Sequence, residues 1–426
     1  MNRRLYDAKA CRRTWIGATI DRKSDEYFKH HVVRNENGAC HPLAAVTATA
    51  MKITAVVQIP DDVVVEILAR LPVKSLLRFR CVCKLWRSII SDSSFIELHR
   101  TLSVTRAGGN LLLLCFPSVA HWPWRLLFYI DHSEEEGHCN AFRNDFSLSG
   151  FSECINGLIC QDDPQPQVCN LSTKERVILP TTAINFPKWI QTSSHCSLGF
   201  EPRNNTYKIL RTWKVYWSSL DWSSRFEIFT LGSNTWRSLI PESNISVPGN
   251  RHSVCVGGTM YWNNLREKNV VAFDVAEERF RLVPSPCRTI HSAIVQLDGR
   301  VAMVNYHGLV DGGDSMRVWV LEDDRNGTWS MEKKIVFPSI WRDVKRGMPS
   351  FCHLIFETTH GAELVFFPQS ESSEKIYVVY YDIERRRMRF KSLVKPEMYG
   401  VGCPPSVCNY VESLESLREI INPNNS

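Results

Sequence analysis

The sequence predicts a small all-α segment followed by a larger all-β domain. Residues 59–92 space their aliphatic side chains as helices do, whereas the sequence after about Leu102 alternates short strands with turns. One strand-turn phrase also recurs in the second part at intervals of 44 to 60 residues. We therefore expect four parts: a poorly ordered leader over 1–55, the helical segment over 56–100, the β domain over 101–415 and a tail over 416–426.

The composition is that of a folded protein. Of the 426 residues, 44% are hydrophobic and 23% are charged, which argues against wholesale disorder. The formal charge of +6 is spread along the chain, whereas nucleic-acid binding needs a clustered basic face. No apolar run is long enough to span a bilayer, and the first thirty residues lack the apolar stretch of a secretory signal. We expect a protein of the cytoplasm or nucleus with no nucleic-acid partner and no membrane partner.

The cysteines and histidines give no sign of a metal site. Fifteen cysteines occur at irregular spacings without a CxxC pair, and the thirteen histidines form no HxH or HExxH motif. We therefore expect reduced thiols, no metal and no cofactor. Cys81 and Cys83, which lie inside the helical block, are expected to be small core residues.

Three short helices are predicted in residues 59–92. The first begins at Pro60, and the two aspartates that follow suit a helix N-terminus. Pro72 separates it from the second helix, and the third runs from Lys84 to about Asp92. So short a block cannot bury all its large apolar side chains among its own helices, so part of its surface needs a partner. A helical subdomain that covers the β domain is the alternative.

A recurring phrase organises the β region. It consists of an apolar strand, a short polar residue, a tight polar turn and then an aromatic or aliphatic residue that we expect to pack in the core. Four-stranded propeller blades repeat at about 40 to 50 residues, so each phrase is interpreted as one hairpin of a β-propeller blade. A β-sandwich of unrelated hairpins is the alternative, which the regular spacing disfavours. The phrases span residues 168–177, 228–236, 272–280, 320–329 and 380–388.

The helical block closely resembles the F-box. The family pattern has a Leu-Pro start, an acidic first turn, an ILxRLP middle and then KSLLRFRCVCKxWRSLISD. It is matched by Ile59-Pro60, Asp61, residues 67–72 and residues 74–92, with Ile59 and Ile89 in place of leucine. The remainder resembles the kelch-like, β-rich F-box-associated domain of the large plant family, through residues 156–160, 198–202 and 257–262.

The resemblance implies a non-catalytic, substrate-recognition subunit of an SCF-type (Skp, cullin, F-box) ubiquitin ligase. In this family the F-box docks on a Skp-family adaptor, which joins a cullin scaffold, and the β domain captures a protein substrate for ubiquitination. A propeller enzyme, or a ligand-binding receptor whose F-box only regulates its own turnover, is the alternative. The residues that the resemblance places on the adaptor face are Ile59, Pro60, Val64, Ile67, Leu68, Leu71, Pro72, Leu76, Leu77, Val82 and Trp86.

Aromatic and histidine side chains in predicted loops are the candidate substrate contacts, because loops on a rigid scaffold commonly carry binding residues. Trp222 lies in the polar stretch 218–224, where an aromatic side chain gains little from burial. By contrast, the tryptophans and phenylalanine that end the recurring phrases, Trp236, Phe280 and Trp329, are expected in the core. The candidate substrate contacts are Trp222, Trp122, Trp124, Tyr306 and His307.

Overall fold

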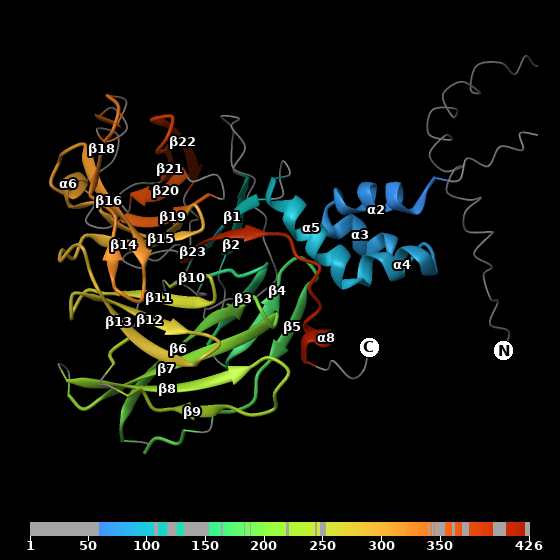
Figure 1. The fold of residues 1–426 in the computed structure, drawn as a ribbon, viewed down its shortest axis with the longest axis horizontal. Coiled ribbons are helices and arrows are strands. Elements are labelled where there is room, and N and C mark those ends of the chain that lie inside the picture. The colour runs from blue at the N-terminus through green and yellow to red at the C-terminus, as the bar shows by residue number, and fades with distance from the viewer. Residues whose placement is uncertain are drawn as a thin grey trace, which may run out of the picture. The chain divides into compact units, whose positions relative to one another are not determined.

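The computed structural model divides the chain into two compact units, Met1–Leu98 and His99–Ser426 (Figure 1). The structure describes residues from Ile59 to Ile421, so the leader expected over residues 1–55 lies outside the described residues. The residues within this span that are not described are 106–109, 117–125, 132–152, 163–164, 183, 188, 219–220, 243–244, 248–252, 340, 343–344, 346–353, 360–362, 369–374 and 395–405.

The three predicted helices of the first unit are present, and a fourth follows them. Pro60 and Pro72 precede the first residues of two helices, where a fixed φ and a missing N–H are tolerated. No helix in the described part of the chain is long and apolar enough to cross a membrane. The helices in the described part of this unit are α2 (Asp61–Ala69), α3 (Val73–Phe79), α4 (Lys84–Ser91) and α5 (Ser93–Thr105), the last of which continues into the second unit.

The cysteines of the helical block are not the core residues that we expected. Cys81 is exposed, and Cys83 is half-buried at the N-terminus of α4, where its Sγ accepts a hydrogen bond from the Trp86 backbone N–H at 3.5 Å. A thiol at this position can satisfy one of the N–H groups that a helix start leaves unpaired. Cys83 therefore caps α4, and the helical core is built instead from Leu68, Ala69, Val73, Leu76, Ile90 and Phe95.

The described strands of the second unit form six antiparallel sheets. Five sheets consist of strands consecutive in sequence, and the sixth has the order β2-β1-β23. The strands are β1 (Asn110–Phe116), β2 (Leu126–Asp131), β3 (Leu158–Gln161), β4 (Gln167–Asn170), β5 (Glu175–Ile178), β6 (Gln191–Glu201), β7 (Thr206–Tyr216), β8 (Trp222–Thr230), β9 (Arg237–Leu239), β10 (Val254–Val256), β11 (Thr259–Asn264), β12 (Asn269–Asp274), β13 (Arg279–Pro284), β14 (Ser292–Leu297), β15 (Arg300–Asn305), β16 (Ser315–Asp323), β17 (Thr328–Trp329), β18 (Lys333–Val336), β19 (Leu354–Thr358), β20 (Glu363–Pro368), β21 (Lys375–Asp382), β22 (Arg387–Val394) and β23 (Ser406–Val411).

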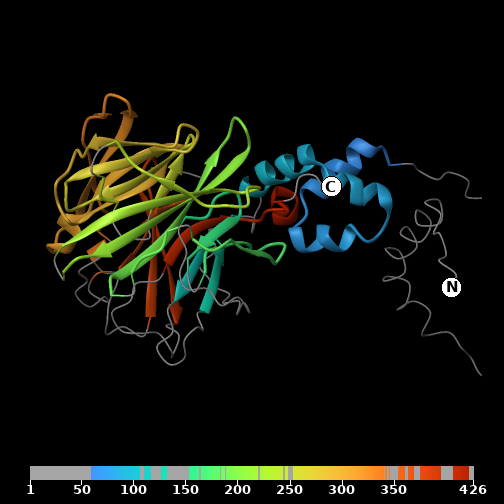
Figure 2. The same cartoon turned by 90° about the horizontal axis from the view of Figure 1, so that it is seen from below.

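The sheets follow one another as the blades of a β-propeller do. Strands of successive sheets are neighbours: β3 contacts β6, β6 contacts β11, β10 and β11 contact β14, β14 contacts β19, and β19 contacts β23. The last sheet joins the two ends of the unit, because β23 pairs with β1, with Cys408 opposite Leu113. Figure 2 shows the teal strands β1 and β2 beside the red C-terminal part of the chain. This arrangement confirms the predicted propeller and excludes the β-sandwich.

The recurring phrase forms the hairpin between the last two strands of a sheet. In four of the five phrases, an Asn or Asp side chain accepts hydrogen bonds from backbone N–H groups two and three residues later. These residues are Asn170, Asp274, Asp323 and Asp382. The repeated pattern in the sequence is therefore a repeated turn.

The residues that end the phrases pack in the apolar layers between sheets. Trp236 is 5% exposed and belongs to a cluster with Tyr207 and Phe229, as predicted. Phe280 and Trp329 are half-buried and pack against the clusters of the next two layers. Side chains from neighbouring sheets interlock in these layers, which hold the ring together.

Residues 416–421 of the segment predicted as a tail pack on the β unit instead, and residues 422–426 lie outside the described residues. The packed part contains α8 (Leu417–Ile421), whose Leu417 is fully buried in the same cluster as Trp236. The Glu175 carboxylate accepts a hydrogen bond from the Leu417 backbone N–H at 2.7 Å. A short amphipathic run is hard to recognise in sequence when its apolar partner lies far away in the chain.

Glycines in the tight turns before β3 and β15 differ in how closely they are surrounded, which leads to a testable prediction. Gly157 and Gly299 both have positive φ, +78° and +69°. A Cβ on Gly157 would lie 2.3 Å from the Ser413 Cβ, beside the closing strand β23, whereas a Cβ on Gly299 would meet nothing within 4 Å. Gly299→Ala should therefore lower the free energy of unfolding only by the cost of placing alanine at a positive φ, about 1 to 2 kcal/mol. Gly157→Ala should lower the free energy of unfolding by about 1 to 3 kcal/mol more than Gly299→Ala, because its Cβ would overlap Ser413.

Urea unfolding of the two glycine variants, followed by circular dichroism, measures this difference. Gly299→Ala is the matched control, since it makes the same substitution in the same kind of turn. Equal unfolding midpoints for the two variants would contradict the close approach of residues 156–157 to β23.

Candidate functional site

The helical unit has an exposed apolar stripe along α2. Ile59, Val63 and Ile67 are 50%, 41% and 51% exposed. They are spaced four residues apart, so Val63 and Ile67 lie on one side of the helix, and Ile59 precedes them by one turn. We call these three residues the α2 stripe. Three neighbouring exposed aliphatic side chains are typical of a docking surface.

The predicted adaptor-face residues fall into three groups. The exposed ones are Ile59, Pro60, Ile67 and Pro72, and the half-buried ones are Val64, Leu71, Leu77, Val82 and Trp86. Leu68 and Leu76 are only 1% and 0% exposed, so their place on the adaptor face is corrected: they pack the helices against one another. Leu68 points away from the α2 stripe because adjacent helical residues differ by about 100°. Adaptor contact by the exposed residues stays a prediction.

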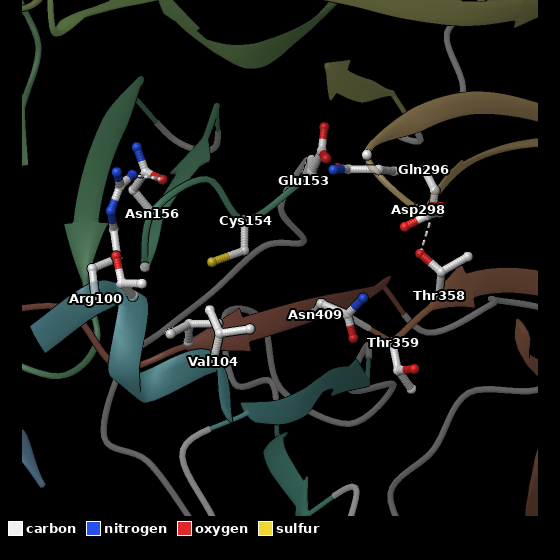
Figure 3. A pocket seen from close by; sticks show the side chains of 14 residues that line it. Arg100, Val104, Glu153, Cys154, Asn156, Gln296, Asp298, Thr358, Thr359 and Asn409 are labelled. Atoms are coloured by element: carbon white, nitrogen blue, oxygen red, sulfur yellow. Dashed lines mark hydrogen bonds between the residues drawn. The ribbon is translucent and has the colours of Figure 1, made fainter. Parts of the chain in front are cut away.

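The β unit contains a polar pocket of about 530 Å³ (Figure 3). Its walls come from the C-terminal end of α5, the turns before β3 and β15, the end of β19 and strand β23. In Figure 3, Arg100 lies on one side, and Glu153, Gln296 and Asp298 lie on the other. The lining residues are Arg100, Thr101, Val104, Glu153, Cys154, Asn156, Gly157, Gln296, Asp298, Gly299, Thr358, Thr359, Asn409 and Val411.

Hydrogen bonds fix the Arg100 side of this pocket. Arg100 donates from Nη1 to Asn156 Oδ1, and Asn156 Nδ2 donates to the Tyr207 hydroxyl at 2.9 Å. The pocket thus presents a held cation across from carboxylates, an arrangement that suits a small polar molecule with groups of both signs. Among the described residues, no group of three His, Cys, Asp or Glu side chains could hold a metal ion.

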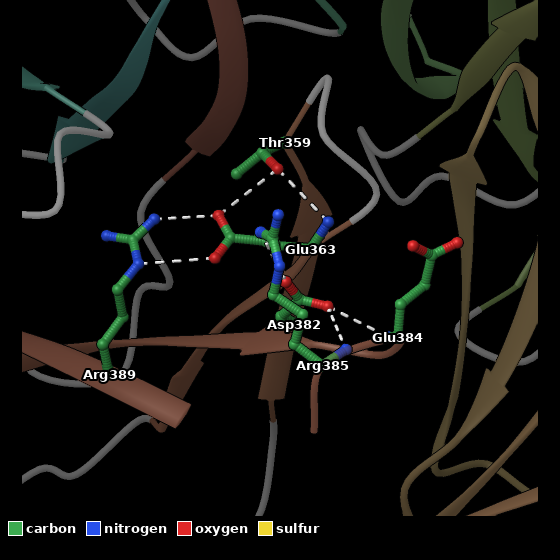
Figure 4. A network of polar contacts seen from close by, with 6 residues as sticks. All are labelled: Thr359, Glu363, Asp382, Glu384, Arg385 and Arg389. Carbon is green, nitrogen blue, oxygen red and sulfur yellow. Dashed lines mark hydrogen bonds and ion pairs between the residues drawn. The ribbon is translucent and has the colours of Figure 1, made fainter. Parts of the chain in front are cut away.

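A polar network fixes the opposite rim, beside Thr359 (Figure 4). Arg389 makes two hydrogen bonds to the Glu363 carboxylate, at 2.8 and 3.4 Å, and its guanidinium lies 3.8 Å from the Tyr380 ring centroid. The Glu363 backbone N–H donates to Thr359 Oγ1 at 3.2 Å. The bidentate pair joins the first residue of β20 to β22 beside the pocket, so its role in the pocket is structural.

Figure 4 also shows the turn between β21 and β22, whose hydrogen bonds stabilise the hairpin. The Asp382 carboxylate accepts the backbone N–H groups of Glu384 and Arg385 at 2.9 and 2.8 Å. The hydrogen bond from Arg385 N–H is the main cause that lowers the pKa of Asp382 below its usual value. The side chains of Arg385 and Arg386 at the tip are exposed.

The predicted substrate contacts are only partly at the surface. Trp222 is half-buried and is the first residue of β8, not a loop residue. Tyr306 is 4% exposed and packs in a core cluster, because the chain turns into the short helix α6 (His307–Val310) at this point; its place as a substrate contact is therefore corrected. His307 is exposed and stacks on His291 with ring centroids 5.4 Å apart. Trp122 and Trp124 lie outside the described residues.

Exposed residues that sequence reasoning missed lie near Trp222. Trp189 and Trp217 are 80% and 54% exposed. The pairing of Gln191 with Tyr216 places both tryptophans at the same end of the β6–β7 hairpin. Trp217 alternates with apolar strand residues and was therefore not distinguishable from a core residue by pattern alone.

The comparisons with known proteins agree with this architecture. Residues 57–98 match the F-box domain, and residues 111–400 match the F-box associated beta propeller domain. The F-box protein At1g30790 of Arabidopsis thaliana is 27% identical over 407 residues, which cover 87% of this chain and 99% of that protein. The putative F-box protein At5g52610 of the same plant is 28% identical over 354 residues, covering 78% and 92% of the two chains. The chain belongs to the F-box proteins that carry an F-box associated β-propeller domain.

Proposed function

We propose that this chain is the substrate-recognition subunit of an SCF-type ubiquitin ligase and acts in the cytoplasm or nucleus. The observation that carries the proposal is an F-box with an exposed α2 stripe on the same chain as a β-propeller. The F-box binds a Skp-family adaptor and through it a cullin scaffold, and the β unit binds a protein substrate. The chain itself is not catalytic: it raises the effective concentration of the substrate near the ubiquitin-charged enzyme.

Burial of the α2 stripe provides the energy for adaptor binding in this proposal. Each large aliphatic side chain that becomes fully buried contributes up to about 1.5 to 3 kcal/mol. Ile59 and Ile67 are each about half exposed, so both retain apolar surface that a partner can cover. Binding of two such anchors is sufficient to distinguish the adaptor from proteins that lack a complementary groove.

A second candidate function rests on the polar pocket of the β unit. With a volume of about 530 Å³ and groups of both signs, it has the size of a small-molecule site. In this alternative the chain is a ligand-binding receptor, and the F-box only directs the turnover of the receptor itself.

Affinity capture from plant cells, with and without a proteasome inhibitor, separates the two functions. We expect the wild-type chain to recover the adaptor, a cullin and other proteins whose ubiquitinated forms accumulate under the inhibitor. The variant Ile59→Ala/Ile67→Ala should recover those proteins without the adaptor and without their ubiquitinated forms. If the chain itself is the one protein whose ubiquitination depends on Ile59 and Ile67, the receptor alternative is correct and the proposal is wrong.

A further inference from the structure

Two cations share the indole of Trp222 at one end of the β7 and β8 strands. Lys214 Nζ lies 4.3 Å from the ring centroid, and the Arg266 guanidinium carbon lies 5.4 Å from it. Lys214 belongs to β7, whereas Arg266 lies in the turn between β11 and β12 of the next sheet. The indole therefore lies where two neighbouring sheets meet.

The strand register explains why these groups come together. Tyr216 pairs with Trp222 and Lys214 pairs with Ser224, so Lys214, Tyr216 and Trp222 project from the same face of their sheet. Leu210 and Phe226 share this face and pack against Met260 and Phe273 of the next sheet. The apolar layer between the two sheets thus ends in a tryptophan flanked by two positive charges.

These two cations differ from the other cations that bridge sheets. Lys208 and Arg237 both contact Glu278 of the next sheet, at 2.9 and 2.6 Å, and Arg281 contacts Asp324 at 2.7 Å. Within the part of the chain that the structure describes, neither Lys214 nor Arg266 lies within ion-pair distance of a carboxylate. Lys214 and Arg266 contact the indole ring of Trp222, whereas the cations at the other two positions contact a carboxylate.

Among the described residues, no carboxylate compensates this positive charge. Lys214 is half-buried, so it is partly removed from water without a counter-ion from the described part of the chain. The acids of the adjoining turns, Asp221 and Glu267, are both exposed, and Glu267 accepts a hydrogen bond from Asn269 Nδ2 at 3.4 Å. A carboxylate within reach of both Lys214 and Arg266 would interact favourably with both charges at once.

Two exposed tryptophans lie at the same end of the sheet as the two cations, and Trp217 projects from the opposite face, where its Nε1 donates to Ser223 Oγ. Trp217 is 54% exposed and immediately follows β7, and Trp189 is 80% exposed at the same end of the β6–β7 hairpin. Tryptophan and arginine are enriched among the residues that dominate protein–protein binding energy. We call Lys214, Trp222 and Arg266 the β7–β8 surface.

We propose that the β7–β8 surface binds an acidic segment of a protein substrate. One carboxylate of the segment lies within reach of both Lys214 and Arg266, and a neighbouring apolar side chain packs on Trp222. The inference deepens the proposed function, because it rests on the chain being a substrate receptor. It names the class of sequence that the receptor selects: carboxylate side chains interspersed with apolar ones.

Selection of random peptides displayed on phage by the full-length chain tests this inference. Peptides selected by the wild-type chain should be enriched in Asp and Glu next to apolar residues. Synthetic copies should bind the variant Lys214→Met/Arg266→Met at least about tenfold more weakly than the wild type, because both charges that face the carboxylate are removed. Copies with Asn and Gln in place of Asp and Glu should lose a similar factor on the wild-type chain.

The matched control is Arg385→Met/Arg386→Met, which removes the same charge from another exposed site of the same unit. This control should bind the selected peptides as the wild type does. Equal weakening by both double variants would show that only net charge matters and would overturn the inference. A selected pool without enrichment in acids, or peptide binding that does not depend on Lys214 and Arg266, would also overturn it.

Adaptor binding by the same preparations separates this inference from the proposed function. The Lys214→Met/Arg266→Met variant should bind the adaptor normally, since its substitutions lie in the β unit. If the wild-type chain fails to bind the adaptor but selects acidic peptides, the proposed function fails and the peptide site stands. If it binds the adaptor but selects no acidic peptides, the inference alone fails.

Discussion

Replacing Trp236 by alanine should lower the free energy of unfolding of the β unit by about 3 to 5 kcal/mol. Trp236 is 5% exposed, lies 5.2 Å from Phe229 between ring centroids, and shares its cluster with Leu417 of α8. Its Nε1 donates a hydrogen bond to the Pro180 carbonyl at 2.9 Å. The substitution therefore leaves a large cavity and an acceptor without its donor. Urea unfolding of the full-length chain measures the loss.

Trp217→Ala is the matched control for this substitution. Trp217 is 54% exposed, and its Nε1 donates to Ser223 Oγ at 3.2 Å on the surface. Its removal should change the free energy of unfolding by no more than about 0.5 to 1 kcal/mol. If the two variants lose the same stability, then Trp236 is not the core residue that this packing requires.

The second large effect concerns adaptor binding. Ile59→Ala/Ile67→Ala should weaken binding to a Skp-family adaptor by at least about thirtyfold. The reason is that each truncated anchor should cost about 1 to 3 kcal/mol of binding free energy, and 1.4 kcal/mol corresponds to a factor of ten. Both side chains are about half exposed in the free chain, so their truncation should leave the helices folded. Surface plasmon resonance with immobilised adaptor measures the change.

Two further variants control the adaptor experiment. Ile178→Ala/Ile290→Ala truncates two exposed isoleucines of the β unit, 54% and 65% exposed, and should bind the adaptor as the wild type does. Leu68→Ala truncates a buried residue of α2 and should instead destabilise the helical unit by about 2 to 5 kcal/mol. Normal adaptor binding by Ile59→Ala/Ile67→Ala would rule out the α2 stripe as the interface.

The helical unit was predictable except for its last helix. The prolines and apolar spacing predict α2, α3 and α4. Asp92 was interpreted only as the end of a helix, yet its carboxylate also accepts the backbone N–H of Ser94 at 2.9 Å and so begins α5. One residue can end a helix and cap the next, and a local pattern does not distinguish these roles.

The repeat was predictable in the β unit, but the closure of the ring was not. Each hairpin is a local structure whose turn residues are visible in the sequence. The pairing of Leu113 with Cys408, by contrast, joins strands from opposite ends of the unit, and no local signal specifies such a pairing.

Apolar positions were easier to predict than their exposure. The resemblance placed Leu68 and Leu76 on the adaptor face, although both are buried, and Val63 of the α2 stripe was left out. Lys214 and Arg266 meet at Trp222 only because two sheets lie side by side, so their juxtaposition depends on the tertiary fold.

Titration of the full-length chain with a purified Skp-family adaptor in a calorimeter measures directly whether the helical unit is a docking domain. We expect a one-to-one complex with a dissociation constant below about 1 μM, which corresponds to roughly 8 kcal/mol of binding free energy. The variant Ile59→Ala/Ile67→Ala should show no detectable heat of binding at the same concentrations. A wild-type chain that is folded by circular dichroism and does not bind the adaptor at about 100 μM would contradict a docking role of the helical unit.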